Sequence, residues 1–144
     1  MQKKVEARIP FDQTSFVVDK LNYLHKGGRC SAVALLGANL LKIKPSIVVN
    51  NGKMGVDKKY FGNLDKVLMK YVQDTLQKYN TPDLTRIFVT HTEMDKQIVD
   101  KVVDYLKQNT QFKEVWETTA GSTITCHCGS HTLGILYLND GDKM

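Results

Sequence analysis

The alternation of hydrophobic and polar positions divides the chain into short helices and strands. The clearest helix begins at Gly62 or Asn63, because apolar residues from Leu64 to Tyr79 recur at intervals of three and four. β-Branched runs predict strands, and Asn50-Asn51-Gly52 predicts a tight hairpin between two of them. The expected elements are helices at 15–25, 32–41, 63–79 and 93–109, and strands at 46–50, 53–60, 86–91, 115–119, 123–128 and 133–138.

In this order, helices alternate with strands in the middle of the chain and hairpins lie at both ends. We therefore predict an α/β fold, with a mixed sheet of about six strands and helices packed on it. Residues 1–13 are polar and contain Pro10, so we interpret them as a lead-in segment, and residues 14–144 as a single domain. A chain of 144 residues is long enough to bury a core of its own.

Composition and charge narrow the classes of function. The net charge is +5, but the lysines are spread along the whole chain and do not cluster with aromatic residues, so no nucleic-acid surface is indicated. No apolar run reaches the roughly 18 residues of a membrane-spanning helix, and the N-terminus lacks the apolar core of a signal peptide. Three cysteines, two of them one residue apart, do not suggest a disulfide scaffold, which favours a cytoplasmic location.

Polar chemistry is concentrated between the last two expected strands. If 123–128 is a strand, Cys126 and Cys128 share one face, and His127 lies alone on the other at the strand's end. The loop Gly129-Ser130-His131-Thr132 follows directly. Backbone N–H groups in such a loop, together with a histidine, can hold a carboxylate or a phosphate. The alternative is a structural histidine beside an ordinary turn.

A second candidate anion site is Gly27-Gly28-Arg29, which precedes the helix expected at 32–41. Glycines allow a ligand to approach the free N–H groups at a helix start, and Arg29 adds a fixed positive charge. The alternative is a turn between helices with an arginine on the surface.

A metal site built on the cysteines and histidines is not expected. Neighbouring ligands on a strand point in opposite directions, and the usual zinc spacing of cysteines is missing. The thiols of Cys126 and Cys128 also lack the C-x-x-C arrangement of redox sites, so we interpret them as small buried hydrophobes. The residues weighed for a metal were Cys126, His127, Cys128 and His131, with Cys30, His25 or His91 to complete a set.

Several segments, in their order and spacing, resemble the DegV family over about residues 14 to 139. The segments that carry this resemblance are Leu21-Asn-Tyr-Leu-His-Lys-Gly-Gly-Arg29, Leu41-Lys-Ile-Lys-Pro45, Asn51-Gly-Lys53, Cys126-His-Cys-Gly129 and Thr132-Leu-Gly-Ile135. The resemblance covers the C-terminal half of the family's two-domain members. It implies that an N-terminal domain of the same parent protein is missing from this chain.

The resemblance implies a bacterial lipid-binding domain rather than an enzyme. It would be part of a carrier that presents the carboxylate of a bound long-chain fatty acid to a separate fatty acid kinase subunit, with no cofactor of its own. His127 falls on the histidine that hydrogen-bonds the carboxylate, and Arg29 on the arginine close to it. The expected ligand-binding residues are His127, Arg29, Gly28, Gly129 and Thr132.

A second hypothesis remains open at this point. In it the chain is a small cytosolic enzyme, in which His127 or His131 acts as general base on an anionic substrate. The lining of the site separates the two hypotheses, because a long apolar tunnel suits a carrier and a small polar cleft suits an enzyme. The sequence gives neither the acyl chain length nor the oligomeric state.

Overall fold

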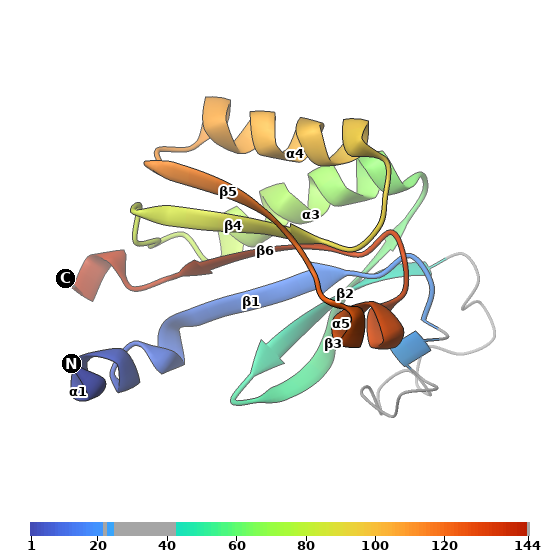
Figure 1. The fold of residues 1–144 in the computed structure, drawn as a ribbon. Helices are drawn as coiled ribbons and strands as arrows, with labels where there is room; N and C mark the ends of the chain where they lie inside the picture. The colour runs from blue at the N-terminus through green and yellow to red at the C-terminus, as the bar shows by residue number, and fades with distance from the viewer. Residues whose placement is uncertain (22, 25–42, 144) are drawn as a thin grey trace.

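A six-stranded mixed sheet forms the centre of the computed structural model, which describes residues 1–21, 23–24 and 43–143 (Figure 1). The strand order is β3-β2-β1-β6-β4-β5. All neighbouring strands pair antiparallel except β4 and β5, which are parallel. The strands are β1 (Asp12–Val17), β2 (Ile43–Asn50), β3 (Lys53–Phe61), β4 (Arg86–His91), β5 (Glu114–Thr119) and β6 (Leu133–Leu138). The α/β fold and the sheet of six strands are thus confirmed.

Helices α3 (Leu64–Lys78) and α4 (Lys96–Asn109) cover one face of this sheet, and α5 (Ser122–Cys128) lies on the other (Figure 1). The main hydrophobic core lies beneath α3 and α4. Its fully buried side chains include Leu68, Val72, Ile87, Val99, Leu106 and Ile135. A smaller cluster on the α5 side contains Val18, Leu21, Leu24, Ile47 and Cys128.

Sequence reasoning correctly placed the first hairpin and the central elements. Asn51 and Gly52 turn the chain with φ of 51° and 75°, the left-handed conformation that asparagine and glycine tolerate. Helix α3 begins after Asn63 as expected. Helix α4 starts a few residues later than predicted, because its first turn is capped by Asp95, whose carboxylate accepts the Gln97 N–H at 2.9 Å.

The helix predicted over 15–25 was wrong at its start, because strand β1 occupies Asp12–Val17. Its burial alternates with the period of two that a strand requires, but two of the buried positions are the polar residues Gln13 and Ser15. Because these buried positions are polar, the hydrophobicity pattern of the sequence did not indicate a strand here. β1 pairs with both β2 and β6.

The strand predicted over 123–128, and with it the second hairpin, was also wrong, because these residues form α5. Its first backbone bond runs from the Thr125 N–H to the Gly121 oxygen at 3.0 Å. The apolar alternation did not reflect burial, since Ile124 and Cys126 are exposed and Cys128 is buried. The inference that Cys126 and Cys128 share a face fails for the same reason.

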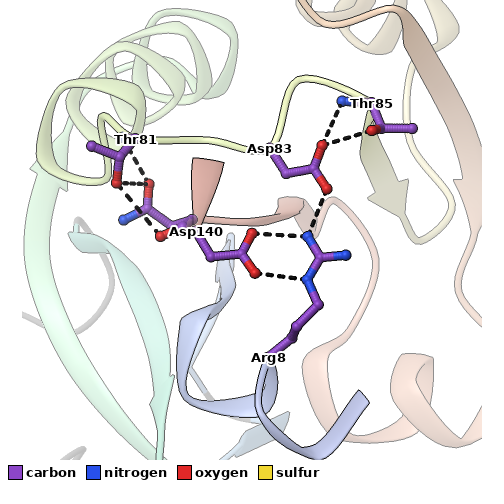
Figure 2. Close-up of polar contacts among 6 residues, drawn as sticks. Arg8, Thr81, Asp83, Thr85 and Asp140 are labelled. Atoms are coloured by element: carbon purple, nitrogen blue, oxygen red, sulfur yellow. Dashed lines mark hydrogen bonds and ion pairs between the residues drawn. The ribbon is translucent and has the colours of Figure 1, made fainter. Parts of the chain in front are cut away.

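The segment before β1 is attached to the body of the domain. It contains α1 (Gln2–Glu6) and a short 3-10 turn, Ile9–Phe11. Arg8 donates from Nε and Nη2 to the Asp140 carboxylate at 2.6 and 2.8 Å, and from Nη2 to Asp83 at 2.6 Å (Figure 2). These contacts join the segment before β1, the loop after α3 and the residues that follow β6.

Candidate functional site

His127 is half-buried in the last turn of α5. This helix lies on the face of the sheet opposite α3 and α4 (Figure 1). Cys128 anchors this turn because its side chain is buried in the smaller hydrophobic cluster. Burial also raises the pKa of the Cys128 thiol. Among the described residues, no hydrogen bond to the His127 imidazole is found.

Gly129 ends α5 in a conformation that other residues avoid, with φ 80° and ψ 176°. A Cβ at this position would lie 2.6 Å from Cδ2 of Tyr23. Both the backbone conformation and the close approach of the Tyr23 ring therefore require glycine. The Gly129 N–H already donates to the Thr125 oxygen at 2.8 Å, so Gly129 shapes the loop rather than offering an N–H to an anion.

Thr132 closes the loop from the other side and is buried. Its hydroxyl donates to the carbonyl oxygens of Cys128 and Gly129 at 3.1 and 3.2 Å. In this arrangement, the single proton of the Thr132 hydroxyl is directed at the protein backbone. The hydroxyl therefore positions the loop that follows His127.

Thr92, directly after β4, helps to hold this loop to the sheet. Its buried hydroxyl donates to the Gly129 oxygen at 2.8 Å and accepts the Thr132 N–H at 3.1 Å. The Thr92 N–H donates to the Thr132 oxygen at 2.9 Å. The N–H groups of Gly129, His131 and Thr132 donate within the protein, whereas the Ser130 N–H has no acceptor among the described residues.

Sequence reasoning missed two of these residues. It gave neither Thr92 nor Tyr23 a role in the site. The position of Thr92 directly after a buried strand was a weak signal for its role. Nothing local indicated that Tyr23 would lie against a glycine more than a hundred positions away.

Gly28 and Arg29 lie outside the described residues, so the structure gives neither their positions nor their distances from His127. The described residues that most closely precede Gly28 and Arg29 are Tyr23 and Leu24. Leu24 is fully buried in the same cluster as Cys128. Leu24, the last described residue before Arg29, is thus anchored beside α5.

The other described histidines have different surroundings. His91 is held between the Thr92 carbonyl, 2.7 Å from Nδ1, and the Glu117 carboxylate, 3.0 Å from Nε2. His131 is exposed, and its Nδ1 lies 3.1 Å from the Ser130 hydroxyl. No group of three or more metal-ligating side chains occurs among the residues that the structure describes. None of the helices in these residues has the length and apolar character needed to cross a membrane.

The fold and the anchored loop define an α/β domain with a candidate ligand site centred on a histidine. The chain belongs to the DegV family: a family model described as "Uncharacterised protein, DegV family" matches residues 1–140. The expected resemblance is thereby confirmed.

Similar proteins include a fatty acid-binding protein from Thermotoga maritima, 28% identical over 83% of this chain and 41% of that protein. The solved structure of a DegV lipid-binding protein from the same organism is 26% identical, with a TM-score of 0.74, over 95% of this chain and 47% of that one. The fatty acid kinase (Fak) B3 protein of Streptococcus pneumoniae, solved with linoleic acid, has a TM-score of 0.80 at 17% identity, over 96% of this chain and 48% of that one. The last likeness shows the fold. The chain spans about half the length of the relatives it matches.

Proposed function

We propose that the chain is a non-catalytic fatty-acid-binding domain in which His127 hydrogen-bonds the carboxylate of a long-chain fatty acid. The observation that carries the proposal is the half-buried imidazole of His127 beside a loop held rigidly to the sheet. Membership of the DegV family supports it, as do the relatives named for fatty acid or lipid binding. No cofactor is needed for this role.

The energetics of such a site divide between the two ends of the ligand. Burial of an acyl chain contributes about 0.8 kcal/mol per CH₂ group, so an apolar channel supplies most of the affinity. The carboxylate then needs a few fixed donors, and a hydrogen bond to a charged group contributes about 1.5–3 kcal/mol. In this proposal His127 and the Ser130 amide are two of these donors, and Arg29 with Gly28 would complete the set.

The other half of the site would come from an N-terminal domain of the parent protein, with residues 14–144 forming the C-terminal domain. The matched relatives are about twice as long as this chain. Large apolar side chains stand exposed on α5 and β5, as expected of a surface that another domain covers; they are Ile124, 49% exposed, and Trp116, 52% exposed.

In the whole protein we infer a bacterial, cytoplasmic carrier that presents the bound carboxylate to a separate fatty acid kinase subunit. The rival function, an enzyme with His127 or His131 as general base, has no observation in its favour.

The test uses the full-length parent protein. Organic extraction and mass spectrometry of the purified protein should recover a long-chain fatty acid. His127→Ala should weaken hexadecanoate binding at least tenfold, as loss of a charge-assisted hydrogen bond implies. His131→Asn is the matched control, because asparagine tolerates the positive φ of 63° at this exposed position, and it should bind as the wild type does.

Equal affinity in the wild type and His127→Ala would remove His127 from the site. A parent protein that carries no lipid and takes up none would overturn the function itself. Measuring the 144-residue chain in parallel shows whether this domain binds hexadecanoate unaided.

A further inference from the structure

Strands β3 and β5 form the two edges of the described sheet, and they differ in how their outer sides are protected (Figure 1). β3 carries Lys53, Lys58 and Lys59, and its register with β2 shifts within the strand. Lysines and bulges are common means by which an edge strand avoids pairing with another chain. β5 contains neither lysine nor proline, and its register with β4 runs without a shift from Glu114 to Thr119. The edge at β5 therefore lacks these protections.

The backbone of β5 directs alternate hydrogen-bonding groups to its outer side. At the two ends of the strand, the N–H groups of Glu114 and Ala120 donate toward β4 at 3.1 and 2.8 Å. Successive residues of a strand direct their backbone groups to opposite sides, so the even-numbered residues of β5 face β4. Val115 and Glu117 consequently point their N–H and C=O groups away from β4, where the described sheet has no further strand. These groups can pair with a strand from another molecule.

The sequence of β5 is self-complementary when two copies pair antiparallel about a two-fold axis. With Trp116 opposite Trp116 of the second copy, Val115 lies opposite Glu117, and Glu114 lies opposite Thr118. Val115 and Glu117 are the residues with outward backbone groups, so they form the hydrogen-bonded pairs. Trp116 then occupies the non-hydrogen-bonded position, where opposing side chains come closest. No like charges stand directly opposite in this register.

The neighbouring symmetric registers fit less well. A two-fold axis through Glu117 would place two carboxylates directly opposite one another, which is destabilising. An axis through Val115 would leave Thr118 and Thr119 without a partner residue in the opposing strand. The register centred on Trp116 is thus the one in which the whole strand contributes.

Trp116 is the side chain that this pairing would remove from water, since it is 52% exposed. Its ring is already held in place within one copy. Nε1 donates to the Glu114 carboxylate at 3.0 Å, the Arg86 guanidinium lies 5.9 Å from the ring centre, and the Phe88 ring lies 6.4 Å away between centroids. An ordered ring loses little conformational freedom when it is bound, and aromatic pairs across strands stabilise a sheet.

Charges around the register centred on Trp116 are complementary. Lys113, directly before β5, comes diagonally across from Glu117 of the second copy, within the reach of long side chains. Glu114 is paired within its own copy with Arg86, at 3.2 Å. The two-fold axis repeats each of these pairs, so opposite charges meet on both sides of the contact.

We propose that β5 is an interaction surface for a second copy of this chain, which pairs antiparallel about a two-fold axis at Trp116 and joins the two six-stranded sheets into one. A single short strand offers far less than the roughly 1,600 Å² of a standard interface, so the dimer forms at high protein concentration. This self-association is independent of the proposed fatty acid function.

The experiment is sedimentation equilibrium of the 144-residue chain from about 10 μM to about 1 mM. The average mass should rise from that of one chain toward that of two. Trp116 is the single tryptophan, so its fluorescence should shift to shorter wavelength with the same midpoint. Trp116→Lys places two ammonium groups opposite one another and should weaken association at least about tenfold. Phe61→Lys is the matched control, an exposed aromatic residue on the β3 edge, and should leave the dissociation constant unchanged.

Glu117→Pro tests the backbone pairing by itself. Proline removes an N–H that points outward and that β4 does not use, and edge strands tolerate proline at such positions. This variant should also associate at least about tenfold more weakly than the wild type. Glu117→Gln loses the same charge but keeps the N–H, and it should associate within about twofold of the wild type. Circular dichroism checks that each variant is folded.

A wild-type chain that stays monomeric throughout the series would overturn the pairing, and Trp116 would then belong to the surface that the N-terminal domain covers. Association that is equally strong in Trp116→Lys would also overturn it, as would association that Phe61→Lys weakens just as much. If Trp116→Lys fails to fold, Glu117→Pro decides by the same criterion.

Discussion

Replacing Gly129 with alanine tests the conformation of the loop that follows His127. Gly129 combines φ of 80° with ψ of 176°, a region that residues with a Cβ occupy at a cost of about 1–3 kcal/mol. The added Cβ would also lie 2.6 and 2.8 Å from two carbon atoms of the Tyr23 ring. Carbon atoms normally meet at about 3.5–4.0 Å, so either the ring or the loop must move.

The magnitude follows from these two contributions. The Tyr23 side chain is 46% exposed, so its ring can move aside, and the steric contribution should be near the low end of about 1–3 kcal/mol for overpacking. Together with the backbone cost, Gly129→Ala should destabilise the domain by about 2–4 kcal/mol. In a Tyr23→Ala background the same substitution should cost about 1 kcal/mol less, because the steric part is relieved and the backbone part remains.

Urea denaturation followed by circular dichroism measures both values, provided that the slope of the transition is unchanged. Gly55→Ala is the control: Gly55 lies in β3 with nothing within 4 Å of an added Cβ, and its substitution should change stability by less than about 0.5 kcal/mol. If Gly129→Ala were as harmless as Gly55→Ala, the described loop conformation would be wrong. If Gly129→Ala cost the same in the wild-type and Tyr23→Ala backgrounds, the Tyr23 contact would be refuted, but the backbone strain at Gly129 would stand.

Substitutions at three further positions test other parts of the structure. Hydrogen bonds from Thr85 and Arg8 lower the pKa of Asp83 to about 2, and Arg8 also lowers the pKa of Asp140. A carboxyl group with a depressed pKa stabilises the fold above its unfolded value of 3.8 and loses that effect as the pH falls. Arg8→Met should therefore be less stable than the wild type at neutral pH, with a gap that narrows between about pH 4 and pH 2; a constant gap would contradict this. Thr92→Val leaves the Thr132 N–H unpaired and removes one of the two hydroxyl donors to the Gly129 carbonyl, so it should cost about 1–3 kcal/mol and speed hydrogen exchange in the loop, whereas Thr92→Ser should cost less than about 1 kcal/mol. Leu106→Ala should lower stability by about 2–5 kcal/mol in thermal denaturation; a loss below 1 kcal/mol would show that this side chain is not in the core.

Elements whose signals are local could be predicted from the sequence. The hairpin between β2 and β3 depends on two residues with positive φ, and both lie in the turn itself. Helix α3 shows its apolar stripe because its buried side chains, such as Leu68 and Val72, are hydrophobic. In these cases, the pattern of hydrophobic residues and the pattern of burial coincide.

The two wrong elements are those in which tertiary contacts override local preference. In β1, Ser15 can be buried because Tyr71, 56 positions away, supplies its hydrogen bond. In α5, the Thr-Ile-Thr segment has the composition of a strand, but its helix is fixed by burial of Cys128 and by the loop contacts of Thr92. The sequence singled out the His127 loop through its dense polar residues, but the side chains that hold the loop come from elements distant in the chain.

The order of the strands also has a consequence for how the chain folds as it is synthesised. In the described sheet, β3, β2 and β1 form one group, β4 and β5 form another, and β6 joins the two by pairing with β1 and β4. Of the strands in this sheet, β6 is the last to leave the ribosome. Until it emerges, the apolar edges of both groups stay open to misassociation, and loop closure across more than a hundred residues makes their union slow. The final strand is therefore expected to set the moment at which a nascent chain becomes protected from proteases and from aggregation.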